Sequence, residues 1–232
     1  MSSRLRASTV LLAVLAVAGC SPVAASPGGS PAPAAPPVLR IMPLGDSITQ
    51  GAGSTTGAGY RQALWEHLAG VDYVGSQASG AATDPDHEGH GGYTINQVRV
   101  GLDGWLAAAR PDVILLHLGI NDLAAGTQAG AAERLIALID RIHEDLPTAK
   151  VLVLGLIPTT GGLQTEVAKV NAVVNASQAR HNYRYVAPPA LGPSEMADRL
   201  HPNDAGYQRI ADAIYAELNR MELARQRVGN QP

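Results

Sequence analysis

Short apolar runs, each closed by glycine or proline, alternate with segments of helical periodicity through most of the chain. Runs of this length bounded by turn residues are typical of buried strands, and their continuous apolar character indicates burial on both faces. Strands that alternate with helices predict an α/β fold with an open, parallel, five-stranded sheet and right-handed crossovers. The five runs are residues 38–45, 71–74, 112–118, 151–157 and 183–187.

The segments between these runs carry helix signals. Thr94 and Gln97 form a capping box, which marks the start of a helix, and Asn203 is a candidate N-cap for the last one. Residues 77–93 show neither helical nor strand periodicity and are expected to form a long polar loop. The predicted helices cover residues 60–69, 95–109, 135–146 and 163–181, with a last one after Asn203.

The N-terminus has the pattern of a signal peptide. Arg4 and Arg6 precede an apolar run, residues 9–19, that is too short to span a bilayer comfortably. The run ends at Cys20 in a sequence that resembles the lipobox of bacterial lipoproteins, in which the cysteine is lipidated and becomes the first mature residue. An ordinary secretory signal cut near residues 24–26 is the alternative. Both predict an extracellular protein, tethered to the cell surface if Cys20 carries a lipid.

The sequence as a whole divides into four expected parts. Residues 1–20 are the expected signal peptide, and residues 21–37, rich in Pro, Ala, Gly and Ser, the expected disordered spacer. Residues 38–221 are the expected folded domain, which we predict to be a monomer, and residues 222–232 a polar tail.

Charge and cysteine content exclude several functions. The net charge is -3 without a basic block, which gives no support for binding nucleic acid. Cys20 is the only cysteine, so the chain can form neither an internal disulfide nor a zinc site built on a cysteine cluster. The only predicted attachment to a membrane is the lipid at Cys20.

Ser47 lies where the first predicted strand ends, in Gly45-Asp46-Ser47. The N–H groups of the turn or helix that follows a strand have no helical partner and can hold negative charge. In an open parallel sheet, ligands bind beyond the carboxyl ends of the strands. Polar motifs follow four of the predicted strands there, which makes Ser47 a candidate nucleophile.

A serine hydroxyl becomes a good nucleophile only when a base accepts its proton. Histidine, with an ordinary pKa of about 6.5, suits this role near neutral pH, and a carboxylate on its other ring nitrogen fixes the tautomer. Asp198 and His201 are three residues apart, and Pro202 disfavours helical geometry at His201. These two residues are therefore the candidate orienting acid and base, the alternative being that His201 merely starts a helix.

Two further motifs follow predicted strands. The side chain of Asn121 can donate to an oxyanion, whereas Asp122 is expected to brace the loop and Asp46 to support the serine turn. Residues 84–93 contain two histidines, two aspartates and a glutamate, but they match neither the helical zinc motif nor the calcium loop. A metal there stays an alternative. We expect this loop to supply a glycine N–H instead, and no metal or cofactor to be needed.

These motifs together resemble the SGNH (GDSL) hydrolase superfamily, in the order found there. The closer likeness is to acetylxylan esterases of carbohydrate esterase family 3, on residues 41–47, 59–61, 74–77 and 87–95. The resemblance implies a flavodoxin-like three-layer α/β/α sandwich. The shared motifs are Gly45-Asp46-Ser47, a glycine within residues 87–95, Gly119-Ile120-Asn121-Asp122 and Asp198-Arg199-Leu200-His201.

The resemblance also implies the roles of single residues. Ser47 would be the nucleophile, His201 the base and Asp198 its orienting carboxylate. The oxyanion hole would come from the N–H of Ser47, the side chain of Asn121 and the N–H of Gly92, with Gly89 as the alternative glycine.

The expected function is a serine esterase acting on short acyl esters, in particular an enzyme that deacetylates a polysaccharide such as xylan. A lysophospholipase, thioesterase or lipase of the same fold is the first alternative. A tethered carbohydrate-binding protein without catalysis is the second.

Overall fold

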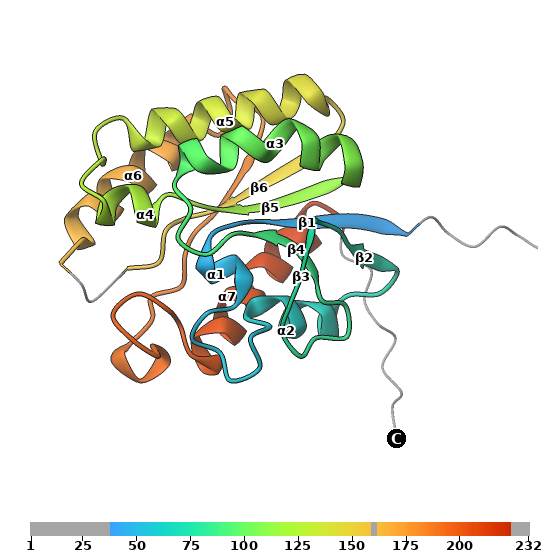
Figure 1. The fold of residues 1–232 in the computed structure, drawn as a ribbon, viewed down its shortest axis with the longest axis horizontal. Helices are drawn as coiled ribbons and strands as arrows, with labels where there is room; N and C mark the ends of the chain where they lie inside the picture. The colour runs from blue at the N-terminus through green and yellow to red at the C-terminus, as the bar shows by residue number, and fades with distance from the viewer. Residues whose placement is uncertain (1–37, 159–161, 224–232) are drawn as a thin grey trace, which may run out of the picture. The chain divides into compact units, whose positions relative to one another are not determined.

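The computed structural model of the protein describes residues 38–158 and 162–223, whose central sheet is drawn in Figure 1. The predicted signal peptide, Cys20, the spacer and most of the polar tail lie outside the described residues. The strands are β1 (Leu39–Gly45), β2 (Val71–Tyr73), β3 (Gln77–Ala78), β4 (Asp86–Gly89), β5 (Val113–His117), β6 (Lys150–Leu154) and β7 (Arg184–Val186). The helices are α1 (Ser47–Gln50), α2 (Tyr60–His67), α3 (Ile95–Ala109), α4 (Ile120–Ala124), α5 (Ala131–Asp145), α6 (Gln164–Ser177) and α7 (Asp204–Arg220), with a 3-10 turn, η1 (Pro193–Glu195).

The prediction of a parallel α/β sheet is confirmed, but its strand count is wrong. In the described residues the sheet has seven strands in the order β3-β4-β1-β5-β6-β7, and β2 pairs with β1 as well. β2 runs parallel to the beginning of β1 and β4 runs parallel to its end, so both lie along the same edge. β3 is the one antiparallel strand of this set.

The two missed strands lie in residues 77–93, which the sequence predicted as loop. β4 has the sequence Asp86-His87-Glu88-Gly89, and its inner side chains, His87 and Glu88, are buried polar groups. They bond to serines of the neighbouring segment, Ser79 and Ser76. A strand that buries polar side chains shows no apolar alternation, which is why its sequence did not reveal it.

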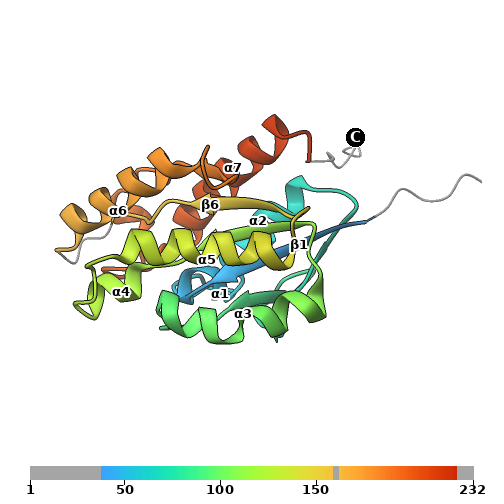
Figure 2. The same cartoon turned by 90° about the horizontal axis from the view of Figure 1, so that it is seen from above.

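Helices cover both faces of the sheet, giving the predicted three-layer α/β/α arrangement (Figures 1 and 2). Successive residues of a strand point to opposite faces, so that Met42 faces the α3, α5 and α6 side, whereas Ile41 packs with α2 and α7. The same alternation continues in β5 and β6, whose side chains are buried on both faces. This burial explains the continuous apolar runs in the sequence.

The strand order defines where a site can form. After β1 the chain moves outward to β2 and β4 and then returns to the other side of β1 to form β5. The carboxyl ends of β1 and β5 therefore flank a topological switch point, where open α/β sheets bind their ligands. Ser47 follows β1 and Asn121 follows β5, so both residues lie at this point.

None of the helices formed by residues 38–158 and 162–223 has the length and apolar character needed to cross a membrane.

Candidate active site

Ser47 is the first residue of α1, directly after β1. Asp46 caps this short helix, because its Oδ1 accepts a hydrogen bond from the N–H of Ile48 (3.0 Å). The Asp46 side chain is fully buried and lies 3.8 Å from the Nδ1 of His117. Asp46 therefore fixes the turn that presents the Ser47 hydroxyl.

His201 lies against Ser47, although 154 positions separate them in the sequence. The Ser47 Oγ is 2.9 Å from the Nε2 of His201, and the His201 Nδ1 is 2.8 Å from the Oδ2 of Asp198. An ionised carboxylate only accepts hydrogen bonds, so Nδ1 carries the ring proton. Nε2 is then free to accept the proton of the Ser47 hydroxyl.

Asp198 is fixed by the backbone of its own loop. Its Oδ1 accepts the N–H groups of Leu200 and His201, each at 2.7 Å. Burial raises the pKa of Asp198, but the hydrogen bonds from the His201 ring and from these N–H groups outweigh it and lower the pKa to about 2. The Asp198 carboxylate therefore stays ionised at the pH of about 6.5 around which an imidazole ordinarily gains or loses its proton.

Replacing Asp198 by Asn should remove a pH-dependent part of the stability. Because the folded-state pKa of Asp198 is about 2, below the ordinary 3.8, its hydrogen bonds stabilise the fold above pH 4 and stop doing so as the pH falls toward 2. Thermal unfolding of the parent and of Asp198→Asn from pH 7 to pH 2 should show a melting-temperature difference that shrinks below pH 4. A difference that stays constant down to pH 2 contradicts this assignment.

In a second serine–histidine pair the hydrogen bond runs in the opposite direction, from the histidine to the serine. The Ser79 Oγ is 2.7 Å from the Nε2 of His87, but the His87 Nδ1 accepts the N–H of Gly89 (2.9 Å). Nε2 of a neutral His87 must then carry the proton and donate it to Ser79. Burial, Arg61 and His90 lower the pKa of His87 to about 3, so the ring is neutral. His87 cannot activate Ser79.

The two candidate glycines differ in what their N–H groups contact. The N–H of Gly89 donates to the His87 Nδ1. Gly92 has φ 80° in a turn closed by the Tyr93 N–H and the His90 carbonyl (3.1 Å). This is the third position of a type II turn, which glycine adopts without strain.

The glycine turn lies beside the nucleophile. A Cβ added to Gly91 would be 3.9 Å from the Cβ of Ser47. The side chain of Asn121 approaches from α4, a short helix where the sequence suggested only a loop, and its Nδ2 donates to the carbonyl of Tyr93 (2.9 Å). The amide has a second N–H, so it can hold the turn and still face a ligand.

Asp122 lies behind this site and joins three elements. Its Oδ2 accepts the N–H of Ile95 at the start of α3 (2.9 Å), and its Oδ1 pairs with Arg134 of α5 (2.8 Å). The carboxylate of Asp122 therefore links α4 to α3 and α5 and is fixed in place by both.

His117, the last residue of β5, has a buried ring. Among the described residues neither ring nitrogen has a hydrogen-bond partner, and the Asp46 carboxylate lies 3.8 Å from Nδ1.

Arg61 is a structural residue whose contacts the sequence did not reveal. Its side chain is fully buried and donates to the carbonyls of five residues, two of them in α1, the helix that begins at Ser47. An arginine in the first turn of a helix is usually exposed to solvent, and nothing in the sequence around Arg61 indicated that it would be buried. The acceptors are the carbonyl oxygens of Thr49, Gln50, Gly57, Ser79 and Pro85.

Among residues 38–158 and 162–223, no group of three or more His, Cys, Asp or Glu side chains is arranged to hold a metal ion. Four of the five acidic and histidine side chains of residues 84–90 hydrogen-bond to protein groups. Glu88 bonds to Ser76 and His90, and Asp84 accepts the N–H of Tyr73.

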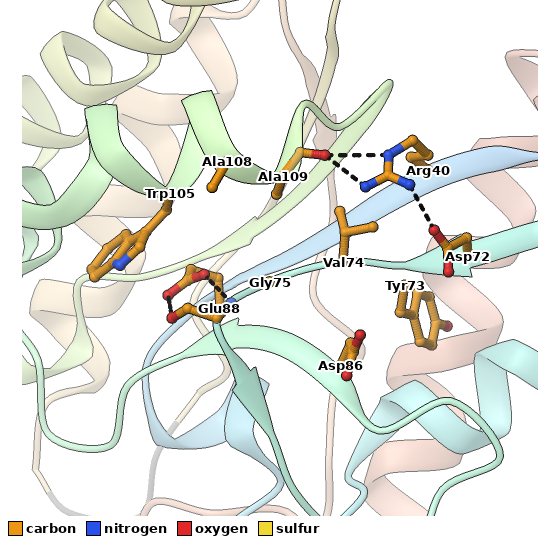
Figure 3. A pocket seen from close by; sticks show the side chains of 11 residues that line it. Arg40, Asp72, Tyr73, Val74, Gly75, Asp86, Glu88, Trp105, Ala108 and Ala109 are labelled. Atoms are coloured by element: carbon orange, nitrogen blue, oxygen red, sulfur yellow. Dashed lines mark hydrogen bonds and ion pairs between the residues drawn. The ribbon is translucent and has the colours of Figure 1, made fainter. Parts of the chain in front are cut away.

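A pocket of about 270 Å³ lies between α3 and the β2–β4 edge of the sheet (Figure 3). Arg40 closes one end by bonding to Asp72 and to the carbonyl of Ala109, and Glu88 and Trp105 line the other.

The sequence matches the GDSL-like lipase/acylhydrolase family over residues 44–209. The chain belongs to this family. The matched range contains Ser47, Asn121, Asp198 and His201, and the expected resemblance to SGNH (GDSL) hydrolases is confirmed. The description of the family names lipases and acylhydrolases, enzymes that act on acyl esters.

Three relatives of this acylhydrolase are carbohydrate esterases or esterases by description. A multidomain esterase of Ruminococcus flavefaciens is 30% identical over 211 residues, which are 74% of this chain but 27% of that protein. The structure of a family 3 carbohydrate esterase of Clostridium thermocellum is 32% identical, with a TM-score of 0.73, over 81% of this chain and 99% of that one. The structure of a family 3 carbohydrate esterase of Talaromyces cellulolyticus is 26% identical, with a TM-score of 0.63, over 79% and 97%.

Proposed function

We propose that this acylhydrolase removes acetyl groups from a polysaccharide such as xylan through an acyl-enzyme on Ser47. The observation that carries the proposal is the continuous hydrogen-bonded chain from Ser47 through His201 to Asp198. A hydroxyl, an imidazole and a carboxylate in this order form the arrangement that activates a serine for acyl transfer.

The proposed reaction has two halves. The Ser47 oxygen attacks the ester carbonyl while its proton moves to the His201 Nε2, and the bond to the leaving alcohol breaks as His201 returns the proton to it. Water, deprotonated by the same ring, then attacks the acyl-enzyme and releases acetate and free Ser47. Asp198 stabilises the imidazolium formed in each half.

The negative oxygen formed in each half needs preorganised donors. We assign this role to the N–H groups of Ser47 and Gly92 and to the side chain of Asn121. The position of Gly91, where an added Cβ would lie 3.9 Å from the Cβ of Ser47, and the bond of Asn121 to the same turn support the assignment.

A sugar substrate is supported by the surface next to the triad. A pocket of about 390 Å³ follows Ser47 along the chain and is lined by small and polar residues. One of them, Gly53, packs against His201, since an added Cβ would come within 2.9 Å of the Cβ of His201. Such walls suit a hydroxyl-rich sugar better than a long acyl chain, which needs apolar walls. The lining residues are Gln50, Gly51, Ala52, Gly53, Ser54, Gly57, Ser79 and Gly80.

The enzyme should therefore prefer acetyl esters to long-chain esters. We expect kcat/KM for 4-nitrophenyl acetate to exceed that for 4-nitrophenyl octanoate at least about 100-fold, since six further methylenes would find no apolar wall. Acetate release from acetylated xylan, compared with acetylated chitin fragments, measures the sugar preference. A preference for octanoyl esters or lysophospholipids would favour the lipase alternative. Binding of xylan without hydrolysis of any ester would favour the carbohydrate-binding alternative.

We further propose that the enzyme acts outside the cell as a monomer, tethered by a lipid on Cys20. The sequence of residues 1–20 supports the tether, and ordinary secretion is the alternative. Labelling cells with an alkyne fatty acid tests it: the parent should be labelled in the membrane fraction and Cys20→Ala should not. An unlabelled parent in the culture medium indicates ordinary secretion. Gel filtration at micromolar concentration tests the monomer.

A further inference from the structure

We propose that Glu88 and His90 are positioning residues that hold the N–H of Gly92 where the negative oxygen develops. The inference rests on the proposed function. It concerns two side chains that lie beside the catalytic residues and have no part in the proton transfers.

His90 fixes the glycine turn through its backbone. Its N–H donates to the carbonyl of Gly45 (2.9 Å), the last residue of β1, two positions before Ser47. Its carbonyl accepts the N–H of Tyr93 and thereby closes the turn that contains Gly92. A shift of His90 would therefore shift Gly92 relative to Ser47.

The ring of His90 is itself held on several sides. It stacks on Tyr93, with ring centroids 4.9 Å apart, and on Trp105 at 4.5 Å, with interplanar angles of 18° and 17°. Its Nε2 is 2.6 Å from the Oε1 of Glu88. The side chain is only 12% exposed, so the ring has little space in which to rotate.

Glu88 completes the support from β4. Its carboxylate is fully buried and accepts the Ser76 N–H (2.6 Å) and the Ser76 hydroxyl (2.7 Å) in addition to His90. Three hydrogen-bond donors therefore surround a carboxylate that has no contact with solvent. Figure 3 shows Glu88 pointing toward the Trp105 side of the pocket. The carboxylate thus links β4, the segment after β2 and the glycine turn.

Two nearly isosteric substitutions test this role. Glu88→Gln keeps the volume but turns an amide NH₂ toward groups that need an acceptor, and His90→Phe keeps the aromatic stack but removes the Nε2–H. A donor displaced by about 1 Å loses most of its effect on the transition state and little of substrate binding. We expect each variant to lower kcat for 4-nitrophenyl acetate about 10- to 100-fold, with KM within about twofold of the parent.

A matched control is the pair Asp140–His181, a second carboxylate–histidine bond (2.8 Å) that joins α5 to the turn after α6, elements that carry none of the catalytic residues. Asp140→Asn loses the same kind of interaction and should keep the parent's kcat. Rates are divided by the active-site concentration, titrated with a 4-nitrophenyl phosphonate, so that partial unfolding does not imitate a catalytic defect. The double variant should be no worse than about the worse single one, because both act through one turn.

The outcomes separate this inference from the proposed function. If Glu88→Gln and His90→Phe both retain the kcat of Asp140→Asn per active site, or if the loss appears in KM alone, the positioning role is wrong. If neither variant yields titratable sites although it melts cooperatively near the parent's temperature, the role is supported, because phosphonylation uses the same oxyanion donors. If neither folds, the residues are structural and the inference is overturned. If the parent hydrolyses no ester, or Ser47→Ala does so equally well, the proposed function fails instead.

Discussion

Ser47→Ala should lower kcat/KM for 4-nitrophenyl acetate by about 10⁴- to 10⁶-fold, the range found when a serine nucleophile is removed from a triad. The hydroxyl lost is the one that lies 2.9 Å from the Nε2 of His201. The helix should survive the change, since its cap is Asp46 and the serine side chain is only partly buried. The measurement is steady-state hydrolysis with circular dichroism to verify the fold.

Ser79→Ala is the matched control for this experiment. Ser79 also bonds to a histidine, but His87 donates to it and cannot accept its proton. The variant should keep kcat/KM within a few-fold of the parent, with some loss of stability because the buried His87 N–H loses its acceptor. Equal activities of Ser47→Ala and Ser79→Ala would place the nucleophile elsewhere.

Arg61→Met should destabilise the fold by about 3–5 kcal/mol, because several buried carbonyls lose a donor at a cost of about 1–3 kcal/mol for each one left unsatisfied. The arginine is fully buried and donates to five backbone carbonyls, and a methionine removes all of these donors. Burial lowers the pKa of the guanidinium, but an arginine keeps its charge in a protein. The melting temperature should fall by roughly 10 °C.

Arg141→Met provides the comparison. Arg141 makes ion pairs with Asp103, Glu144 and Asp145, but its side chain is 37% exposed. Exposed ion pairs of this kind contribute little because solvent screens them, so this variant should lose much less stability. Urea unfolding curves of both variants measure the difference. If Arg61→Met is no less stable than Arg141→Met, the carbonyl network does not stabilise the loops around Ser47.

Much of the fold could be predicted because the core strands are apolar on both faces. The runs that became β1, β5 and β6 are continuous and end in turn residues, and Asn203 caps α7 through its side chain as its sequence position suggested. β4 escaped prediction because it buries His87 and Glu88, whose partners come from a separate segment. No periodicity in the local sequence reports a bond to a distant serine.

The candidate site likewise contains residues that could be recognised from the sequence and residues that could not. Ser47, Asp198 and His201 carry chemistry that is recognisable from residue type and from their position after strands, and the structure brings the three together. The contribution of Arg61 could not be predicted, since it depends on five carbonyls that only the folded loops bring close. The bond from the Gly89 N–H to His87, which favours Gly92 in our proposal, likewise depends on an orientation that the local sequence does not encode.

The most direct test of the central claim is the identity of the side chain that takes up a phosphonate. The parent, treated with a 4-nitrophenyl phosphonate and digested, should carry one label per chain, on the peptide that contains Ser47. Labelling should disappear in Ser47→Ala and slow strongly in His201→Ala, in which no ring accepts the proton. A label on any other residue, or esterase activity that survives in a fully labelled Ser47 protein, would contradict the account.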